Sequence, residues 1–363
     1  MNPRLLRTAI AALPDYDPRD LSDDGITIRL HRNEGALPPP AFVLEAIRTV
    51  GPETLRTYPT ALQRDVTIRL AARLGRGAEN LALANGADEI LAVSARIALD
   101  PGDVALTATP TFGMYARVVA LAGGQLRRVP YSTRWRFDAQ ALLDAADERT
   151  RLVILGHPNN PTTDPLRAAD LATVARALPN ALILVDEVYL AFSDRSLARE
   201  ATAFENVVVV GSFSKCASLA GVRVGYALAA PPIAAAIRRA LGPYPVSALS
   251  LVAAQAYLRD PSRTRSYEIQ LEAQVARSLD AFASAFAPFA REIWRGPANF
   301  LLIDCGDGAQ RLRDALAARG IAVRAFDDPM LAGMLRVSAT NDDATDTVIA
   351  ALRAIAREVP AYA

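Results

Sequence analysis

The sequence predicts an α/β protein with a mostly parallel β-sheet. Four short apolar runs alternate with helical patterns, and such alternation is typical of parallel sheets. Because the runs are continuous, without polar residues at every second position, we expect helices to cover both faces of the sheet. The runs are Val104–Leu106, Leu152–Leu155, Leu182–Val185 and Val207–Val210, and the helical patterns cover roughly 87–98, 113–122, 137–146 and 167–177.

A smaller α+β domain is expected in the C-terminal part of the chain. We predict a large domain at 41–230, extending through about residue 260, and a small domain at 261–363. Residues 1–40 are rich in proline and are expected to form an arm and part of the small domain. The small domain is expected to contain a long helix at 263–289, strands at Ile293, 300–303, 321–323 and 334–337, and helices at 309–319 and 343–357.

The composition indicates an ordinary globular protein. The formal net charge is +1, and 51% of the residues are hydrophobic. Without excess positive charge, the chain lacks the electrostatic attraction on which nucleic-acid binding depends. We expect no secretory leader and no membrane span, and two cysteines cannot form a disulfide framework. These features favour a cytoplasmic enzyme.

The chain contains a single lysine, Lys215, among its 40 lysine and arginine residues. Arginine replaces lysine as a surface cation everywhere else, but its guanidinium cannot form an imine with an aldehyde. A lysine retained after a buried strand therefore indicates a position that requires an amine. The alternative is chance survival in an arginine-rich composition.

Two motifs offer phosphate-binding groups. Asn85-Gly86-Ala87-Asp88-Glu89 opens a helical pattern, where backbone N–H groups and the helix dipole attract anions, although it is also an ordinary turn and helix cap. Ser212 and Ser214 precede Lys215, and Arg223 follows it by eight residues. Hydroxyls and a guanidinium around the lysine form a second set of phosphate donors.

Two further motifs offer groups for an aromatic ring. Asp186 ends a predicted strand, and a carboxylate in that position is costly unless it is paired, for example with a pyridinium N–H. Tyr189 and Asn160 could bind an oxygen on the same ring. The segment His157–Thr162 that contains Asn160 could instead be only a rigid loop, because Asn-Pro steps favour turns.

Together these groups describe a single ligand, pyridoxal 5′-phosphate. Its aldehyde would meet Lys215 and its ring nitrogen Asp186. Phe112 is a candidate to stack on the ring, and no metal is expected. The ring oxygen would meet Asn160 and Tyr189, and the phosphate would meet Ala87, Asp88, Ser212, Ser214 and Arg223.

The order of these motifs resembles the fold-type I pyridoxal-phosphate aminotransferases. The resemblance covers nearly the whole chain and implies a large domain with a mostly parallel seven-stranded sheet, a smaller α+β domain and a homodimer with shared active sites. Finer stretches resemble the histidinol-phosphate branch, which implies conversion of histidinol phosphate and 2-oxoglutarate to imidazole-acetol phosphate and glutamate in histidine biosynthesis. These stretches are Leu13–Tyr16, Leu30–Glu34, Arg56–Pro59, Pro243–Ser247, Ala298–Phe300 and Leu335–Ser338.

The resemblance also implies a role for each cofactor residue. Lys215 would hold the cofactor as an imine and then transfer a proton between the substrate α-carbon and the cofactor. Asp186 would keep the ring nitrogen protonated, and Asn160 and Tyr189 would hold the 3′-oxygen. Tyr58 would reach the cofactor phosphate of the neighbouring subunit.

Substrate recognition is implied for a second group of residues. Arg336 would bind the substrate α-carboxylate through two hydrogen bonds, which suits its planar guanidinium. Tyr16 and Arg324 would recognise the distal group of the substrate, which is a phosphate in the histidinol-phosphate branch. Asn33 and Glu34 would line the entrance.

The chain departs from the family pattern at several positions, among them Gly35, Phe112, Thr163, Ser218 and Ala217, which has a smaller side chain. Thr163 and Ser218 replace glycines, Phe112 replaces a tyrosine, and Gly35 replaces a polar residue. These departures keep two substrate alternatives open, an aromatic or other amino-acid aminotransferase and a decarboxylase of an amino-acid phosphate on the same fold. A cofactor-binding regulatory protein is disfavoured, because no DNA-binding segment is appended.

Overall fold

The structure is a computed structural model that describes residues 7, 10, 13, 24–190 and 193–358. The chain divides into two compact units. The large unit includes Pro39–Asn160 and Asp164–Thr264, and the small unit includes Pro161–Thr163 and the residues from Arg265 onward, together with the segment that ends at Pro38. Among the described residues, no helix is both long and apolar enough to cross a lipid bilayer.

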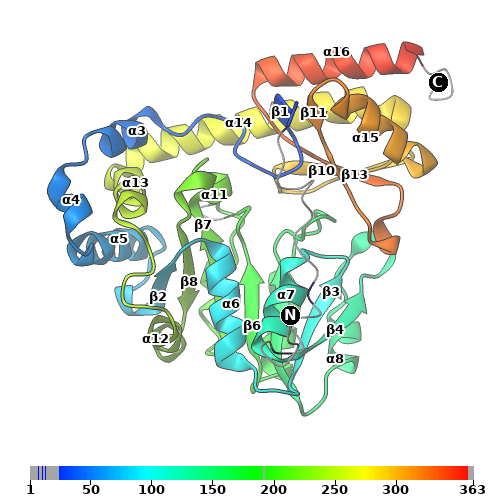
Figure 1. The fold of residues 1–363 in the computed structure, drawn as a ribbon. Helices are drawn as coiled ribbons and strands as arrows, with labels where there is room; N and C mark the ends of the chain where they lie inside the picture. The colour runs from blue at the N-terminus through cyan, green and yellow to red at the C-terminus, as the bar shows by residue number, and fades with distance from the viewer. Residues whose placement is uncertain (1–6, 8–9, 11–12, 14–23, 191–192, 359–363) are drawn as a thin grey trace. The chain divides into compact units, whose positions relative to one another are not determined.

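A seven-stranded sheet forms the centre of the large unit (Figure 1). The strand order is β2-β8-β7-β6-β5-β3-β4, and only β8 runs antiparallel to its neighbours. The predicted mostly parallel α/β sheet is therefore confirmed. The strands are β2 (Leu81–Ala84), β3 (Val104–Thr109), β4 (Gln125–Pro130), β5 (Thr150–Gly156), β6 (Leu182–Asp186), β7 (Val207–Ser212) and β8 (Gly225–Ala229).

Both faces of this sheet are covered, as the continuous apolar runs predicted. Leu182 and Leu184 of β6 pack in a core cluster with side chains from α6, α7 and α12. Ile183 and Val185 point to the opposite face and are equally buried. Fully burying one such side chain contributes about 1.5–3 kcal/mol. The helices around the sheet are α6 (Ala87–Ala98), α7 (Met114–Ala122), α8 (Ala139–Asp144), α9 (Ala168–Ala177), α10 (Ala198–Ala201), α11 (Phe213–Cys216) and α12 (Pro231–Ala240).

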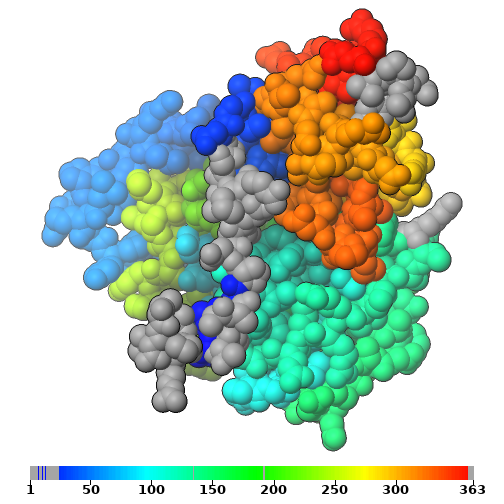
Figure 2. Space-filling model, turned by 45° about the vertical axis from the view of Figure 1, so that its right-hand side comes forward, coloured from blue at the N-terminus to red at the C-terminus, as the bar shows by residue number. Residues whose placement is uncertain are grey.

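Four more helices form a layer at one side of the large unit. Helix α13 (Ala248–Arg259) packs against α3 (Ala41–Arg48), α4 (Pro52–Arg56) and α5 (Thr60–Arg73). In Figure 2 the blue atoms of the early helices lie beside the yellow-green atoms of the α12–α13 region, and both are open to solvent in this view. Part of this layer therefore belongs to the molecular surface.

The small unit has an α+β fold. Its antiparallel sheet has the order β12-β13-β10-β9, and a parallel pair joins β1 to β11. A core of residues from its strands and helices, including Phe282, Phe286 and Leu301, is fully buried. The elements are β1 (Ile28–Arg29), α14 (Pro261–Phe286, which begins in the large unit), β9 (Glu292–Arg295), β10 (Phe300–Asp304), α15 (Ala309–Ala317), β11 (Ile321–Ala322), β12 (Arg324–Ala325), β13 (Met334–Ser338) and α16 (Asp342–Glu358).

Candidate functional site

Three predicted site residues of the large unit, Asn160, Asp186 and Lys215, follow strands that end at one edge of its sheet. Asp186 is the last residue of β6, Lys215 lies on α11 directly after β7, and Asn160 lies four residues after β5. Strands β5, β6 and β7 are adjacent and parallel, so their carboxyl ends share this edge. This is the edge where open α/β sheets bind ligands.

Asp186 is a buried carboxylate with two hydrogen-bond donors. Only 5% of the surface of Asp186 is exposed. The hydroxyl of Tyr115 donates to Oδ2 at 2.9 Å, and the N–H of Val188 donates to Oδ1 at 3.3 Å. Burial raises the pKa of Asp186 to about 6, and the two hydrogen bonds oppose this rise. A cation beside this carboxylate would restore its ionised form, and a pyridinium N–H is such a cation.

Glu187, the next residue, has different partners. Its carboxylate accepts hydrogen bonds from the hydroxyl of Ser196 and, at 2.7 Å, from the N–H of Leu197. Burial raises the pKa of Glu187 to about 7. The Glu187 side chain thus connects the end of β6 to the segment of Ser196 and Leu197, and both of its carboxylate oxygens accept hydrogen bonds from that segment.

A phosphate-sized set of donors lies at the start of α6. Asp88 is in the first turn of this 12-residue helix, and its Oδ2 is 3.1 Å from Nη2 of Arg223. A methyl group added at Gly225 would lie 2.5 Å from the backbone N of Ala87, so glycine allows β8 to approach the helix start closely. The helix dipole and the guanidinium both favour an anion here.

Two hydroxyls extend this donor set. Ser212, at the end of β7, and Ser214, on α11, are both buried, and their hydroxyl oxygens are 2.9 Å apart. The N–H of Ser214 also donates to the Ser212 hydroxyl at 3.0 Å. Hydroxyls, a guanidinium and a helix start fit a phosphate, and buried Asp186 fits a ring N–H. The residues present therefore fit pyridoxal 5′-phosphate.

The aromatic candidates lie in two different places. Phe112 is half-buried, and its ring meets that of Tyr115 edge-on, with centroids 5.8 Å apart. Tyr189 is half-buried and follows β6 by three residues. Tyr58, by contrast, is 77% exposed between α4 and α5 and stacks on Tyr244 with ring centroids 4.5 Å apart.

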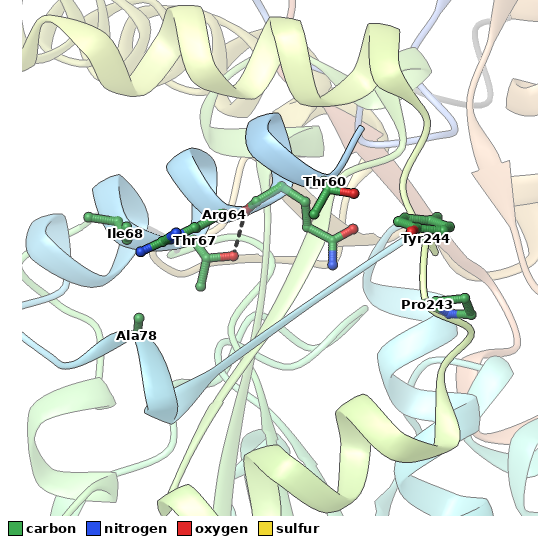
Figure 3. A pocket seen from close by; sticks show the side chains of 8 residues that line it. Thr60, Arg64, Thr67, Ile68, Ala78, Pro243 and Tyr244 are labelled. Atoms are coloured by element: carbon green, nitrogen blue, oxygen red, sulfur yellow. Dashed lines mark hydrogen bonds between the residues drawn. The ribbon is translucent and has the colours of Figure 1, made fainter. Parts of the chain in front are cut away.

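A pocket of about 460 Å³ opens next to Tyr244 (Figure 3). Figure 3 shows it between helix α5 and the segment of Pro243 and Tyr244. None of the predicted cofactor residues lines it. Its lining residues are Thr60, Gln63, Arg64, Thr67, Ile68, Ala78, Pro243 and Tyr244.

The small unit brings two predicted arginines together. Arg324 of β12 and Arg336 of β13 are direct cross-strand partners in the antiparallel ladder, so their side chains share one face of the sheet. Arg336 is buried, donates to the carbonyl of His31 and lies over the ring of Phe300 at 5.5 Å. Like charges directly opposite each other are destabilising, and an anion between them would remove that cost.

Asn33 also lies in the small unit and is buried. Its Oδ1 accepts a hydrogen bond from the hydroxyl of Ser338 at 2.8 Å, and its backbone N–H donates to the same hydroxyl at 3.0 Å. Glu34, next to it, is 3.1 Å from Nε of Arg29. Tyr16 lies outside the described residues.

Thr163 and Ser218, which replace glycines of the family pattern, adopt the left-handed backbone conformation that favours glycine. The φ angle is +65° at Thr163 and +53° at Ser218. Residues with a Cβ adopt such angles at a cost of roughly 1–2 kcal/mol. The turns that contain these residues are therefore strained in this chain.

Sequence reasoning missed Tyr115 and the separate role of Glu187. Tyr115 follows Phe112 by three residues at the start of a predicted helix, where an aromatic residue is most often part of the core. Glu187 stands beside Asp186 in one motif, and only the structure distinguishes their partners. The only sequence signal that could have distinguished the two carboxylates is that successive residues of a strand point in opposite directions.

Comparison with known proteins identifies the family to which this chain belongs. Residues 26–352 match the family of class I and II aminotransferases. The histidinol-phosphate aminotransferase of Symbiobacterium thermophilum is 31% identical over 362 residues, covering 96% of this chain and 98% of that protein. That of Moorella thermoacetica is 32% identical, covering 96% and 92%.

Solved structures share the fold. The crystal structure of histidinol-phosphate aminotransferase from Sinorhizobium meliloti in complex with pyridoxal-5′-phosphate has a TM-score of 0.87 and 28% identity, covering 97% of this chain and 98% of that one. A methionine aminotransferase from Escherichia coli has a TM-score of 0.82 at 23% identity, covering 96% and 99%. The second likeness concerns the fold alone.

Proposed function

The chain belongs to the class I and II aminotransferases and uses pyridoxal 5′-phosphate, and from this premise we propose that it is a histidinol-phosphate aminotransferase. The reaction would convert histidinol phosphate and 2-oxoglutarate to imidazole-acetol phosphate and glutamate. Relatives named for this activity match the chain over nearly its whole length at about 30% identity, which supports the proposal.

The observation in this structure that favours a phosphate substrate is the cross-strand pair of Arg324 and Arg336. Two guanidiniums on one face of a sheet repel each other, and a phosphate, with up to two negative charges and three acceptor oxygens, compensates both. The carboxylates of glutamate and 2-oxoglutarate suit the same groups, because arginine forms two parallel hydrogen bonds with either anion. One pair of arginines can therefore serve both half-reactions.

The residues of the large unit would hold the cofactor and move protons. When bound, the cofactor supplies a ring that withdraws electrons from the substrate α-carbon. Asp186 would hold the ring N–H and keep that ring positively charged, and Asn160 and Tyr189 would orient its oxygen. Lys215, the only amine side chain, would move the proton at the α-carbon.

Its phosphate would be held by a separate set of groups. The backbone at Ala87, the hydroxyls of Ser212 and Ser214 and the guanidinium of Arg223 are the donors of this set. Anchoring at the phosphate and at the ring nitrogen would fix both ends of the cofactor. The reacting carbon then keeps one orientation during both half-reactions.

A second copy of this chain is the proposed partner, and the cytoplasm is the proposed location. Large apolar side chains are exposed on the layer of α3, α4, α5 and α13 and beside the pocket of Figure 3. Clustered exposed apolar residues are typical of protein interfaces. From this layer, Tyr58 would reach the cofactor phosphate of the partner. The exposed side chains are Leu44, Leu55, Tyr58, Ile68, Tyr244 and Leu249.

Single-turnover experiments test the substrate. Holoenzyme is mixed with histidinol phosphate, glutamate, phenylalanine or methionine, and loss of the visible absorbance of the bound cofactor is followed. We expect histidinol phosphate and glutamate to react with the highest kcat/KM. A higher kcat/KM for phenylalanine or methionine, or release of carbon dioxide from an amino-acid phosphate, would contradict the proposal.

A further inference from the structure

Among the described residues, a buried tyrosine hydroxyl is one of two groups that donate a hydrogen bond to the Asp186 carboxylate. Tyr115 is the second residue of α7 and is 2% exposed. Its hydroxyl donates to Oδ2 of Asp186 at 2.9 Å, across 71 positions of sequence. The other donor, the N–H of Val188, is longer at 3.3 Å. Tyr115 is thus the only side chain seen to donate to this carboxylate among the described residues.

The neighbouring backbone leaves room for this contact. Gly156 of β5 is the register partner of Asp186 on β6. A Cβ at Gly156 would lie 3.4 Å from the Tyr115 hydroxyl oxygen and 3.0 Å from Cα of Asn159. The close contact of such a Cβ would be with Asn159, and the Tyr115 hydroxyl lies at ordinary contact distance from it, beside this backbone position. Phe112 packs edge-on against the Tyr115 ring and limits its movement.

The charges around the pair leave Tyr115 as a neutral donor. Burial and the charge of Asp186 raise the pKa of Tyr115 well above its ordinary value, so its proton stays on the hydroxyl. Burial raises the pKa of Asp186, and the Tyr115 hydrogen bond lowers it. The other titratable groups that act on the pair are Asp88 of α6, Glu187 next to Asp186, and the hydroxyls of Tyr131 and Tyr189, and each would disfavour further negative charge.

We propose that Tyr115 is a positioning residue that keeps the Asp186 carboxylate ionised and oriented toward the ring nitrogen of the cofactor. The inference depends on the proposed role of Asp186 opposite that nitrogen. Tyr115 acts only through Asp186. Without the hydroxyl, the buried carboxylate keeps only the longer hydrogen bond from Val188 and takes up a proton more readily. A protonated Asp186 has no charge to pair with a ring cation.

The test is cofactor retention by the holoenzyme as a function of pH. Wild type, Tyr115→Phe and Tyr257→Phe are dialysed against a series of cofactor concentrations at each pH, retained cofactor is measured by absorbance, and the midpoint is read from the pH dependence of the dissociation constant. Tyr257→Phe is the matched control, because it removes another fully buried tyrosine hydroxyl, which donates to the Cys216 carbonyl at 3.5 Å. Titration of the cofactor itself is common to all three proteins, so only differences between them are interpreted.

We expect wild type to lose cofactor as the pH falls through about 6, where Asp186 becomes protonated. Tyr115→Phe should move this midpoint upward by about one to two pH units, the loss expected for one hydrogen bond to a charged group. Tyr257→Phe should keep the wild-type midpoint. A merely structural tyrosine would weaken retention at every pH without moving the midpoint, and that result would overturn the proposal.

Two further measurements separate this inference from the role of Asp186. In Asp186→Asn, the loss of cofactor near pH 6 that comes from protonation of Asp186 should be absent. If the variant still loses cofactor at that pH as wild type does, the assigned role of Asp186 is wrong, and the inference about Tyr115 is wrong with it. If this loss is absent in Asp186→Asn and Tyr115→Phe keeps the wild-type midpoint, only the role of Tyr115 fails. An analogue with carbon in place of the ring nitrogen should bind Tyr115→Phe at least as well as wild type, because a protonated Asp186 is less costly than a carboxylate beside a C–H; weaker binding by Tyr115→Phe would show that Tyr115 does not act through that nitrogen.

Discussion

Replacing Ser218 by glycine should stabilise this protein. Ser218 has a φ of +53°, and its hydroxyl oxygen is buried without a hydrogen-bond partner among the described residues. Relieving the left-handed conformation contributes roughly 1–2 kcal/mol, and removing an unsatisfied buried hydroxyl contributes about 1–3 kcal/mol. The greater freedom of glycine in the unfolded chain offsets about 0.5–1 kcal/mol. We therefore expect the free energy of unfolding to rise by at least about 1 kcal/mol.

The assay is urea unfolding at fixed protein and cofactor concentrations, because both bind the folded chain and shift its apparent stability. Ser218→Ala is the matched variant, since it removes the hydroxyl and keeps the strained angle. Its gain should not exceed that of Ser218→Gly, and the difference measures the backbone strain less the cost of the greater freedom of glycine in the unfolded chain. A glycine variant less stable than the alanine variant, or less stable than wild type, would refute the reasoning.

Three other outcomes are expected. Burial raises the pKa of Glu187 from 4.5 to about 7, so between these pH values the folded chain binds more protons than the unfolded chain, and the free energy of unfolding falls as the pH rises. Glu187→Gln should flatten this slope in unfolding measurements across the same pH range. An unchanged slope in the variant would contradict the role assigned to Glu187. Arg336→Lys should raise KM at least about tenfold for both glutamate and histidinol phosphate, since lysine cannot form the paired hydrogen bonds; an effect on one substrate alone would exclude a shared role. Leu55→Asp, on the exposed face of α4, should shift the proposed dimer toward monomer in analytical ultracentrifugation, whereas unchanged sedimentation would place the interface elsewhere.

The sequence predicted those parts of the fold that depend on local patterns. The apolar runs at 152–155, 182–185 and 207–210 became the buried strands β5, β6 and β7, because strands covered on both faces need apolar residues at every position. Strand β4 has a single buried residue, Val129, and lies at the edge of the sheet. Its polar pattern was therefore indistinguishable from a loop. The apolar runs indicated four strands of this sheet, and only the family resemblance implied seven.

The candidate site was predictable where each group follows its own strand. Asp186 and Lys215 could be assigned to one sheet edge because parallel strands end together. The contact of Tyr115 with Asp186 could not, because it joins residues 71 positions apart and depends on how α7 packs. The sequence showed that Thr163 stands where the family pattern has glycine, and the structure shows that it adopts a positive φ there.

Borohydride reduction of the holoenzyme followed by peptide mapping tests the central claim most directly, because Lys215 is the only lysine in the chain. The account predicts a pyridoxyl group on the peptide that contains Lys215, and loss of that adduct in Lys215→Ala. An unmodified Lys215 peptide from protein that retains its cofactor would contradict it.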